Sequence, residues 1–420
     1  MEMVLEFLRD VLSQPALLIG IMSCIGLIAL KRPFHKIMTG TLKPILGYLM
    51  LAAGAGVIVS NLDPLGKMIE HGFHITGVVP NNEAIVAVAQ KVLGVETMSI
   101  LVVGLLMNLC IARFTKFKYV FLTGHHSLFM ACLMSAVLGT AGLSGMELIL
   151  VGGFLMGAWS AISPAIGQSY TSKVTDGDEI AIGHFGSLGY YLSAWVAKYV
   201  GKAEDSTEDI EIPEKWGFLR DSTLSTALTM IVFYLIAAFA AGSEFVATLS
   251  GDMSPYLYAV MSAMNFAVGV TIVYSGVRMI LGDLIPAFQG IATKIIPNAI
   301  PAVDCAVFFT YAPTAVVLGF LSSFIGGIIG MLILGAVGGV LIIPGLVPHF
   351  FCGATAGIYG NATGGRRGAA VGAFLNGLAI TFLPALALPV LGQLGFQNTT
   401  FGDADFAVMG LVLGNAYEWV

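Results

Sequence analysis

Residues 297–313 read PNAIPAVDCAVFFTYAP, an apolar segment that is interrupted at Pro297, Pro301 and Pro313 and carries one charge, Asp304. Proline removes a backbone donor and clashes with the preceding turn, so this segment cannot form one smooth helix. Broken backbone is tolerated at membrane depth only where it lines a cavity or is buried in protein. A carboxylate at such a place is costly, and it therefore indicates a functional site.

The composition around this segment is that of a membrane protein. Of the 420 residues, 57% are hydrophobic and 10% are charged, and the mean hydropathy is +0.89. Soluble domains carry about 25% charged residues. The length allows about ten spans of about 20 residues, and the 52 glycines suit close helix packing in lipid. The net charge of −6, without large basic clusters, predicts that the protein binds no nucleic acid.

Cysteine usage and the N-terminus exclude two further classes of protein. The five cysteines lie in apolar segments and form no CxxC pair, so we expect packing residues and neither a disulfide framework nor a metal site. The N-terminal MEMVLEFLRD is acidic, so we do not expect it to be a cleavable signal peptide. Residues 1–14 are predicted to form an amphipathic surface helix.

Apolar segments in the first half predict membrane spans. They lie at about 16–30, 44–59, 98–112, 119–138 and 146–166, with a short half-buried helix at 83–93. Lys and Arg concentrate in the connections at 31–43 and 113–118 and are sparse in the longer segment 62–97. Because basic loops face the cytoplasm, the N-terminus is predicted to lie outside.

Residues 169–201, at the end of the first half, open polar and predict a re-entrant or half-helical element, and 202–221 are predicted to form a polar central cytoplasmic loop. The second half of the chain repeats the plan of the first. Further spans are expected at about 224–241, 256–280, 315–335, 342–358 and 369–391, with a more polar helix at 283–296 and a last apolar segment at 403–413. We therefore predict an all-α polytopic membrane protein with a first transmembrane repeat at 1–201 and a second, inverted one at 222–420.

A few polar residues beside apolar runs are candidates for a binding site. His125 and His126 are neighbours, and side chains one residue apart on a helix point about 100° apart, so at least one should face a cavity. His184 follows a charged run; a histidine in such a place can also simply pack between helices. Asp304 is the strongest candidate, although it could also cap a half-helix. Asn82 and Glu83 open the matching short helix of the first half.

Several enzyme signatures are absent from the sequence. There is no HExxH zinc helix, no GxSxG nucleophile elbow and no GxxxxGK[ST] phosphate loop. An intramembrane hydrolase therefore has no supporting motif. Any phosphate chemistry must come from a partner protein.

Short motifs from about Leu17 to Gly414 are similar to those of one transporter family. They are Gly40-Thr41-Leu42-Lys43, Leu122-Thr123-Gly124-His125, Val174-Thr175-Asp176-Gly177, Ile182-Gly183-His184, Glu208-Asp209-Ile210, Ile212-Pro213, Leu224-Ser225-Thr226-Ala227, Gly276-Val277-Arg278-Met279, Ala302-Val303-Asp304-Cys305-Ala306 and Ile342-Ile343-Pro344-Gly345. With these motifs the chain resembles the membrane component, enzyme IIC, of the ascorbate-type phosphotransferase system (PTS).

The resemblance implies both an architecture and partners. It implies a homodimer in the bacterial inner membrane, in which each protomer has a core domain with the sugar site and a V-shaped dimerisation domain. Transport would follow an elevator movement, and the phosphocysteine of a cytoplasmic IIB partner, itself supplied by IIA, would phosphorylate the incoming sugar. No cofactor is implied. The implied substrate-binding residues are Asn82, Glu83, His125, His126, Ser127, Phe129, His184, Phe185 and Asp304.

The sequence departs from the family at three of these positions. His126 and Phe185 follow the two histidines where family members carry glutamine, and Glu83 replaces an aromatic residue. Glutamine offers a polyol both a donor and an acceptor, whereas phenylalanine offers neither. The expected substrate is therefore L-ascorbate or a related sugar acid or polyol. The alternative is an ion-coupled secondary transporter in which Glu83, Asp304 and the histidines carry protons or bind Na⁺.

Overall fold

Helices make up most of the part of the chain that the computed structural model describes. That part comprises residues 10–11, 14–74, 77–80, 82–177, 179–210, 222–392 and 399–416. It contains six helices that are long and apolar enough to cross a membrane, or seven if a pair bent by 116°, Thr226–Ala241 and Ser243–Ser250, is one span. The predicted all-α polytopic membrane fold is confirmed. The surface helix predicted at 1–14 lies almost entirely outside the described residues, as does the end of the central loop, 211–221.

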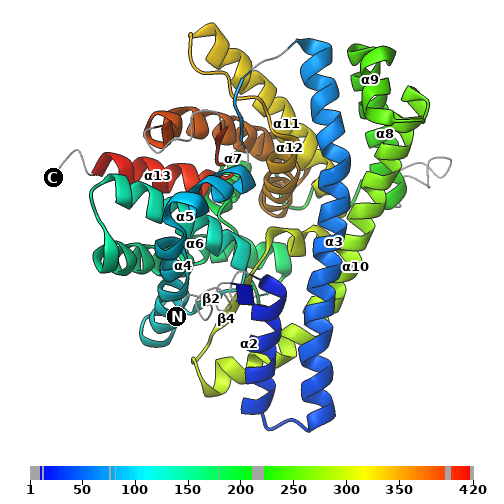
Figure 1. The fold of residues 1–420 in the computed structure, drawn as a ribbon. Coiled ribbons are helices and arrows are strands. Elements are labelled where there is room, and N and C mark those ends of the chain that lie inside the picture. The colour runs from blue at the N-terminus through cyan, green and yellow to red at the C-terminus, as the bar shows by residue number, and fades with distance from the viewer. Residues whose placement is uncertain are drawn as a thin grey trace.

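One group of helices forms a tall layer on one side of the molecule (Figure 1). It consists of α2 (Pro15–Ala29), α3 (Phe34–Phe73), α8 (Ser222–Ala241), α9 (Ser243–Ser250) and α10 (Pro255–Lys294). The helices α3 and α10 run antiparallel and touch through glycines. A Cβ on Gly47 would lie 2.9 Å from the carbonyl oxygen of Gly276, and one on Gly54 would lie 2.7 Å from that of Gly269. Small residues thus let the two backbones approach closely.

The remaining helices form a compact bundle beside this layer (Figure 1). They are α4 (Asn82–Phe114), α5 (Gly124–Thr140), α6 (Gly145–Thr175), α7 (Ser187–Val200), α11 (Pro313–Ala336), α12 (Leu346–Gly392) and α13 (Ala404–Ala416). The helix α12 packs against α11 and α7, and α4 packs against α6. The backbone of α12 leaves the helical conformation at Gly364 and Gly365, which divides it into two helices.

Five short strands lie within the bundle: β1 (Val79–Pro80), β2 (Tyr119–Phe121), β3 (Ala181–Ile182), β4 (Ile300–Val303) and β5 (Thr399–Thr400). They form two small parallel sheets. In one, β4 lies between β2 and β3. In the other, β1 pairs with β5, and Val78 forms an additional parallel bridge to Ile342. Each sheet therefore joins strands from both halves of the chain.

Several predicted segments merge in the structure. The short helix at 83–93 and the span at 98–112 are one helix, α4, and the segments at 256–280 and 283–296 are both part of α10. The predicted span at 44–59 is part of α3, which continues to Phe73. The span predicted at 119–138 is wrong at its start, because residues 119–121 form a strand and the helix begins at Gly124. The backbone groups at the end of a strand and the start of a helix are polar, and a glycine lies at this point. Both features favour a break between strand and helix over one continuous span.

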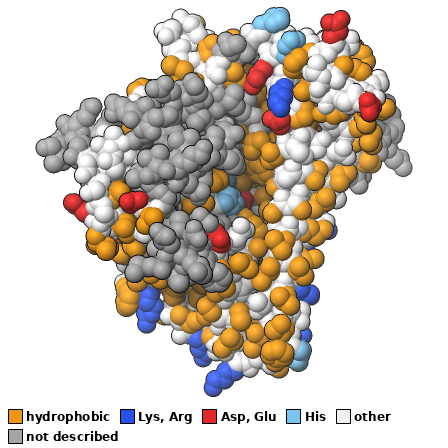
Figure 2. All heavy atoms as spheres, viewed as in Figure 1, with side chains coloured by type: hydrophobic (Ala, Val, Ile, Leu, Met, Phe, Trp, Pro, Cys, Tyr) orange, Lys and Arg blue, Asp and Glu red, His pale blue; other side chains and the backbone are white. Residues whose placement is uncertain are grey.

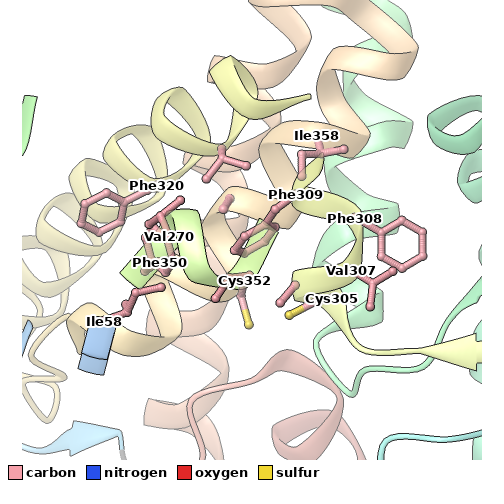
Figure 3. Close-up of a cluster of buried hydrophobic side chains, with 14 of the residues drawn as sticks. Ile58, Val270, Cys305, Val307, Phe308, Phe309, Phe320, Phe350, Cys352 and Ile358 are labelled. Carbon is pink, nitrogen blue, oxygen red and sulfur yellow. The ribbon is translucent and has the colours of Figure 1, made fainter. Parts of the chain in front are cut away.

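A buried aromatic cluster joins the layer to the bundle (Figure 3). Ile58 of α3 and Val270 of α10 lie beside aromatic residues of the 305–310 turn, α11 and α12. The ring centroid of Phe350 lies 5.0 Å from that of Phe266 on α10 and 5.7 Å from that of Phe309. The segment that carries Asp304 is thus packed at the junction of the two groups.

Candidate functional site

The three-stranded sheet explains why distant residues meet. Its strands are parallel, with Phe121 of β2 aligned with Ala302 of β4, and Ile182 of β3 aligned with Val303. Side chains that follow parallel strands emerge at the same edge of the sheet. His125, Asp304 and His184 each follow one of these strands, so they converge although they come from both halves of the chain.

Two local features keep this edge tight. Gly183 is required because a Cβ there would lie 2.4 Å from the carbonyl oxygen of Ala302. Asp304 accepts a hydrogen bond from the backbone N–H of Ala306 at 3.0 Å, so it caps the short 3-10 helix at Cys305–Thr310. The capping role predicted as an alternative for Asp304 is therefore present, and one carboxylate oxygen remains for other contacts.

The second small sheet contributes the opposite wall in the same way. Asn82 follows β1 and Asp403 follows β5. The side-chain amide of Asn82 donates to the carboxylate of Asp403, and its carbonyl oxygen accepts from the backbone N–H of Gly402 at 2.9 Å. The thiol of Cys352 donates to the other carboxylate oxygen of Asp403 at 2.7 Å.

A cavity of about 730 Å³ lies between these two walls and the helix α3. Six of the predicted site residues line it: Asn82, His125, His126, Phe129, His184 and Asp304. A volume of this size is within the range of small-molecule sites. The cavity also extends along α3 to the ion pair between Lys67 and Asp63, whose atoms are 2.8 Å apart, and to Glu70.

The histidine and carboxylate side chains form direct contacts in the cavity. The Nε2 atom of His125 lies 3.5 Å from a carboxylate oxygen of Asp304, and the hydroxyl of Tyr48 lies 3.4 Å from His125 Nδ1. Asp304 is buried and His125 is about one-third exposed. A carboxylate beside an imidazole can orient it and can stabilise its protonated form.

His126 and His184 lie against each other, with ring centroids 3.8 Å apart. The backbone N–H of Phe185 donates to His126 Nδ1 at 3.4 Å, and that of Gly186 donates to His184 Nδ1 at 3.1 Å. An Nδ1 atom that accepts a hydrogen bond has no proton, so in the neutral ring the proton is on Nε2. The hydroxyl of Tyr190 also contacts His184 Nδ1, at 2.8 Å. Both rings can thus donate a hydrogen bond to a ligand from Nε2.

Three predicted residues lie elsewhere or outside the description. The Ser127 hydroxyl donates back to the Thr123 carbonyl at 3.3 Å within its own helix. The ring of Phe185 is buried and stacks on Phe121, with centroids 4.6 Å apart. Neither side chain lines the cavity. Glu83 lies in the first turn of α4, but its side chain is not among the described ones. The site roles of these three residues stay predictions.

Sequence reasoning missed other residues in the cavity, chiefly Tyr48, Cys305 and Asp403. Asp403 gave a usable signal, because it is a carboxylate beside an apolar C-terminal segment, as Asp304 is in its own segment. Tyr48 gave none, since an isolated tyrosine in a glycine-rich span is ordinarily a packing residue.

Two buried sets of side chains in the described residues have the atoms and spacing to hold a metal ion. They are His184, Asp304 and Cys305, and His184, Cys352 and Asp403. Several of these side chains already form hydrogen bonds within the protein: Asp304 caps the 3-10 helix, the Cys352 thiol donates to Asp403, and His184 Nδ1 accepts hydrogen bonds. The geometry alone does not assign a metal to either set.

Comparison with known proteins identifies the family of the chain. Residues 10–405 match the sequence model of EIIC-GAT, described as the PTS system sugar-specific permease component. The chain is 28% identical over 417 residues to the "Ascorbate-specific PTS system EIIC component" of Mycoplasma pneumoniae strain ATCC 29342 / M129. That alignment covers 85% of this chain and 62% of the relative, so the chain spans less than two thirds of the relative's length. The chain therefore belongs to the family of multi-pass sugar-specific permease components of the phosphotransferase system.

Proposed function

We propose that the protein is the sugar permease of a phosphoenolpyruvate-dependent phosphotransferase system and imports L-ascorbate or a related sugar acid or polyol. The observation that carries this proposal is the cavity in which His125, His184 and Asp304 converge from three adjacent strand ends. A carboxylate and Nε2 donors suit a ligand that is rich in hydroxyl groups. The family match and the ascorbate-specific relative support the same substrate class.

Each of these residues has a stated role in the proposal. Asp304 accepts hydrogen bonds from substrate hydroxyls, and His184 donates from Nε2 to substrate oxygens. His125 has its Nε2 toward Asp304, which leaves Nδ1 as its acceptor nitrogen. When a substrate hydroxyl attacks the phosphorus of the phosphocysteine of IIB, the thiolate leaves and the hydroxyl proton needs an acceptor. His125 is the best placed base, because Asp304, 3.5 Å away, stabilises the imidazolium that forms.

The order of elements supports the proposed inverted repeats. The 40-residue helices α3 and α10 each start a series of a strand, one or two helical segments, and a second strand or bridge. Each series then continues with a helix pair, a further strand and a short helix, ending at α7 and α13. The second strand of the α3 series is β2. In the α10 series its place is taken by the bridge at Ile342. Each sheet contains the first strand of one series between the second and third of the other.

The two groups of helices correspond to the proposed domains. The bundle with the cavity is the core domain, and the layer of α2, α3, α8, α9 and α10 is the V-shaped dimerisation domain. Hydrophobic side chains cover the long helices on the face shown in Figure 2, as an interface with lipid or a second protomer requires. Elevator transport moves the core along the layer and carries the cavity across the membrane.

In the proposal, the basic residues set the orientation of the molecule in the membrane, and the extent of the cavity sets the side to which this conformation opens. Lys and Arg side chains gather at the end of the molecule where α2 connects to α3 (Figure 2). The positive-inside rule places that end in the cytoplasm of a bacterium, with the inner membrane around the helices. The cavity reaches Lys67 and Glu70 near the opposite end of α3, so it faces outward.

The experiment that tests the proposal is uptake of labelled L-ascorbate into proteoliposomes, with and without phosphorylated IIB inside, followed by identification of the product. We expect a trapped phosphate ester that forms only with phosphorylated IIB. Phosphorylation of another sugar in place of ascorbate would support the PTS assignment and reassign the substrate. Accumulation of unmodified solute on a proton gradient alone would overturn the proposal in favour of an ion-coupled transporter.

A further inference from the structure

The start of the central loop is folded against the helices of the bundle. The backbone N–H of Gly201 donates to the Ala197 carbonyl at 3.3 Å, and that of Arg366 donates to the Asp205 carbonyl at 2.8 Å. The second contact lies where α12 breaks. A Cβ on Gly365 would lie 2.3 Å from the Lys202 carbonyl oxygen, so only glycine leaves room for the loop here. The 201–210 segment therefore packs against the bundle as an ordered part of the fold and is not simply a solvated connection.

Side chains fix the same segment from both sides. The side-chain oxygen of Asn361 accepts from the backbone N–H of Thr207 at 2.8 Å, and its amide nitrogen donates to the Ser206 hydroxyl at 3.0 Å. Thr207 is buried, and its hydroxyl donates to the Glu208 carboxylate at 2.9 Å. The bond from Thr207 holds the Glu208 carboxylate in a fixed position.

The Glu208 carboxylate caps the first turn of α11. It accepts from the backbone N–H of Thr314 at 3.0 Å, from that of Ala315 at 3.1 Å, and from the Thr314 hydroxyl at 2.9 Å. The local N-cap residue, Ala312, has no side chain that could take this role. An anionic group at a helix N-terminus satisfies free backbone donors and complements the helix dipole. Glu208 thus supplies a cap from 106 residues away in sequence.

The capped turn continues directly into the segment that carries Asp304. Only Tyr311 and Ala312 separate α11 from the 3-10 helix at Cys305–Thr310, which Asp304 itself caps. Upstream, this segment is fixed by β4 in the sheet. Downstream, the segment ends at the first turn of α11, where the Glu208 carboxylate binds the backbone. The prolines Pro301 and Pro313 prevent the segment from holding its shape through continuous helix bonds.

We propose that Glu208 is a positioning residue for sugar binding, which holds the Asp304 segment in place from the central loop. The proposal rests on the proposed function, because it concerns the substrate affinity of that site. It assigns a role to the Glu208-Asp209-Ile210 motif, which lies outside the cavity. A change in the 201–210 segment thereby alters the site without contacting the substrate.

The test compares Glu208→Ala and Glu208→Gln with Asp209→Asn, a matched control at the exposed neighbouring acid. Hydrogen exchange at Thr314 and Ala315 and equilibrium binding of labelled L-ascorbate are measured on the purified full-length protein. We expect Glu208→Ala to speed exchange at these amides by about fivefold, the typical effect of a lost cap on a helix end, and to weaken binding by no more than the same factor. Glu208→Gln should be intermediate, because it keeps one acceptor oxygen, and Asp209→Asn should match the unmodified protein.

The outcomes separate this proposal from the proposed function. Exchange needs no substrate, so unchanged exchange in Glu208→Ala would show that the cap does not form and would overturn the inference alone. Faster exchange with unchanged binding would reduce Glu208 to a local helix cap. If the unmodified protein binds neither ascorbate nor another PTS sugar, the proposed function fails together with any role of Glu208 in sugar binding. Thermal unfolding of each variant, with Glu208→Gln as the milder change, separates these effects from loss of the fold.

Discussion

At the scale of single residues, Asp304 has two separable tasks. One carboxylate oxygen caps the 3-10 helix through the N–H of Ala306, and the other faces His125 in the cavity. Capping requires an acceptor oxygen but not a charge. Binding of several hydroxyls, and stabilisation of a protonated His125, require the charge. A substitution that keeps the oxygen and removes the charge therefore distinguishes the two tasks.

We predict that Asp304→Asn keeps the fold and loses binding. The asparagine oxygen still caps Ala306, so thermal unfolding should change little. Affinity for the transported sugar should fall by about tenfold or more, since hydrogen bonds to a charged group contribute about 1.5–3 kcal/mol. Equilibrium binding and uptake in proteoliposomes measure this loss. Unchanged binding and uptake would leave Asp304 with only the capping task.

We also predict that Asn82 and Asp403 act as one unit. Their side chains are hydrogen-bonded across the second sheet, so alanine at either position removes the same contact. A double-mutant cycle on sugar affinity should give a coupling energy of about 0.5–3 kcal/mol, as is usual for residues in contact. Additive effects would show that the two residues contribute independently. Asn82 paired with Glu208, in place of Asp403, provides the control cycle.

At the scale of elements, the sequence predicted the breaks better than the contacts across them. Prolines and polar residues marked the interruptions near 169–201 and 297–313, and both are interrupted in the structure. The pairing could not be read from sequence, because β3 and β5 are two residues long and carry no alternating pattern. Their partners lie in the other half of the chain. The histidines and Asp304 were found from their chemistry alone. Asp403 carried a similar chemical signal, but its pairing with Asn82 across β1 and β5 could not be read from the sequence.

Because the sheet brings the site together, we predict that widening it abolishes binding. In Gly183→Ala the new Cβ would lie 2.4 Å from the carbonyl oxygen of Ala302, so β3 must separate from β4 and carry His184 away from Asp304. Overpacking of this kind costs about 1–3 kcal/mol of stability. Gly177→Ala is the matched control, since no atom lies within 4 Å of its Cβ position. Thermal unfolding and sugar binding are measured for both. Equal behaviour of the two variants would contradict the role of the sheet.

At the scale of the whole molecule, the layer and the bundle have different packing. The layer is held by a seam of glycines between α3 and α10, and the bundle is joined to it by aromatic rings around Phe350. The order of elements and the pairing of strands between the two halves support the proposed inverted repeats, for which the sequence offered only a matched order of spans and polar breaks. The long helices were harder to delimit, since Pro44 and Pro64 lie inside α3 without ending it.

We predict that the glycine seam tolerates no added methyl group. A Cβ on Gly54 would lie 2.7 Å from the Gly269 carbonyl oxygen, whereas no atom lies within 4 Å of the Cβ position of Gly56, half a turn away. Gly54→Ala should therefore lower stability by about 1–3 kcal/mol. Gly56→Ala should be neutral or slightly stabilising, because alanine favours a helix. Thermal unfolding in detergent compares the two. A stable Gly54→Ala variant would contradict close packing of α3 on α10.

The proposed orientation of the molecule can be tested by labelling from one side. Lys36 lies at the start of α3 near the basic connection, and His74 lies at the far end of the same helix; both are exposed. From the positive-inside rule we predict that Lys36 faces the cytoplasm and His74 the exterior. In a background without Cys24 and Cys110, a membrane-impermeant maleimide should label His74→Cys in intact cells. Lys36→Cys should react only after permeabilisation. The reverse pattern would invert the topology, and the cavity described here would then face the cytoplasm.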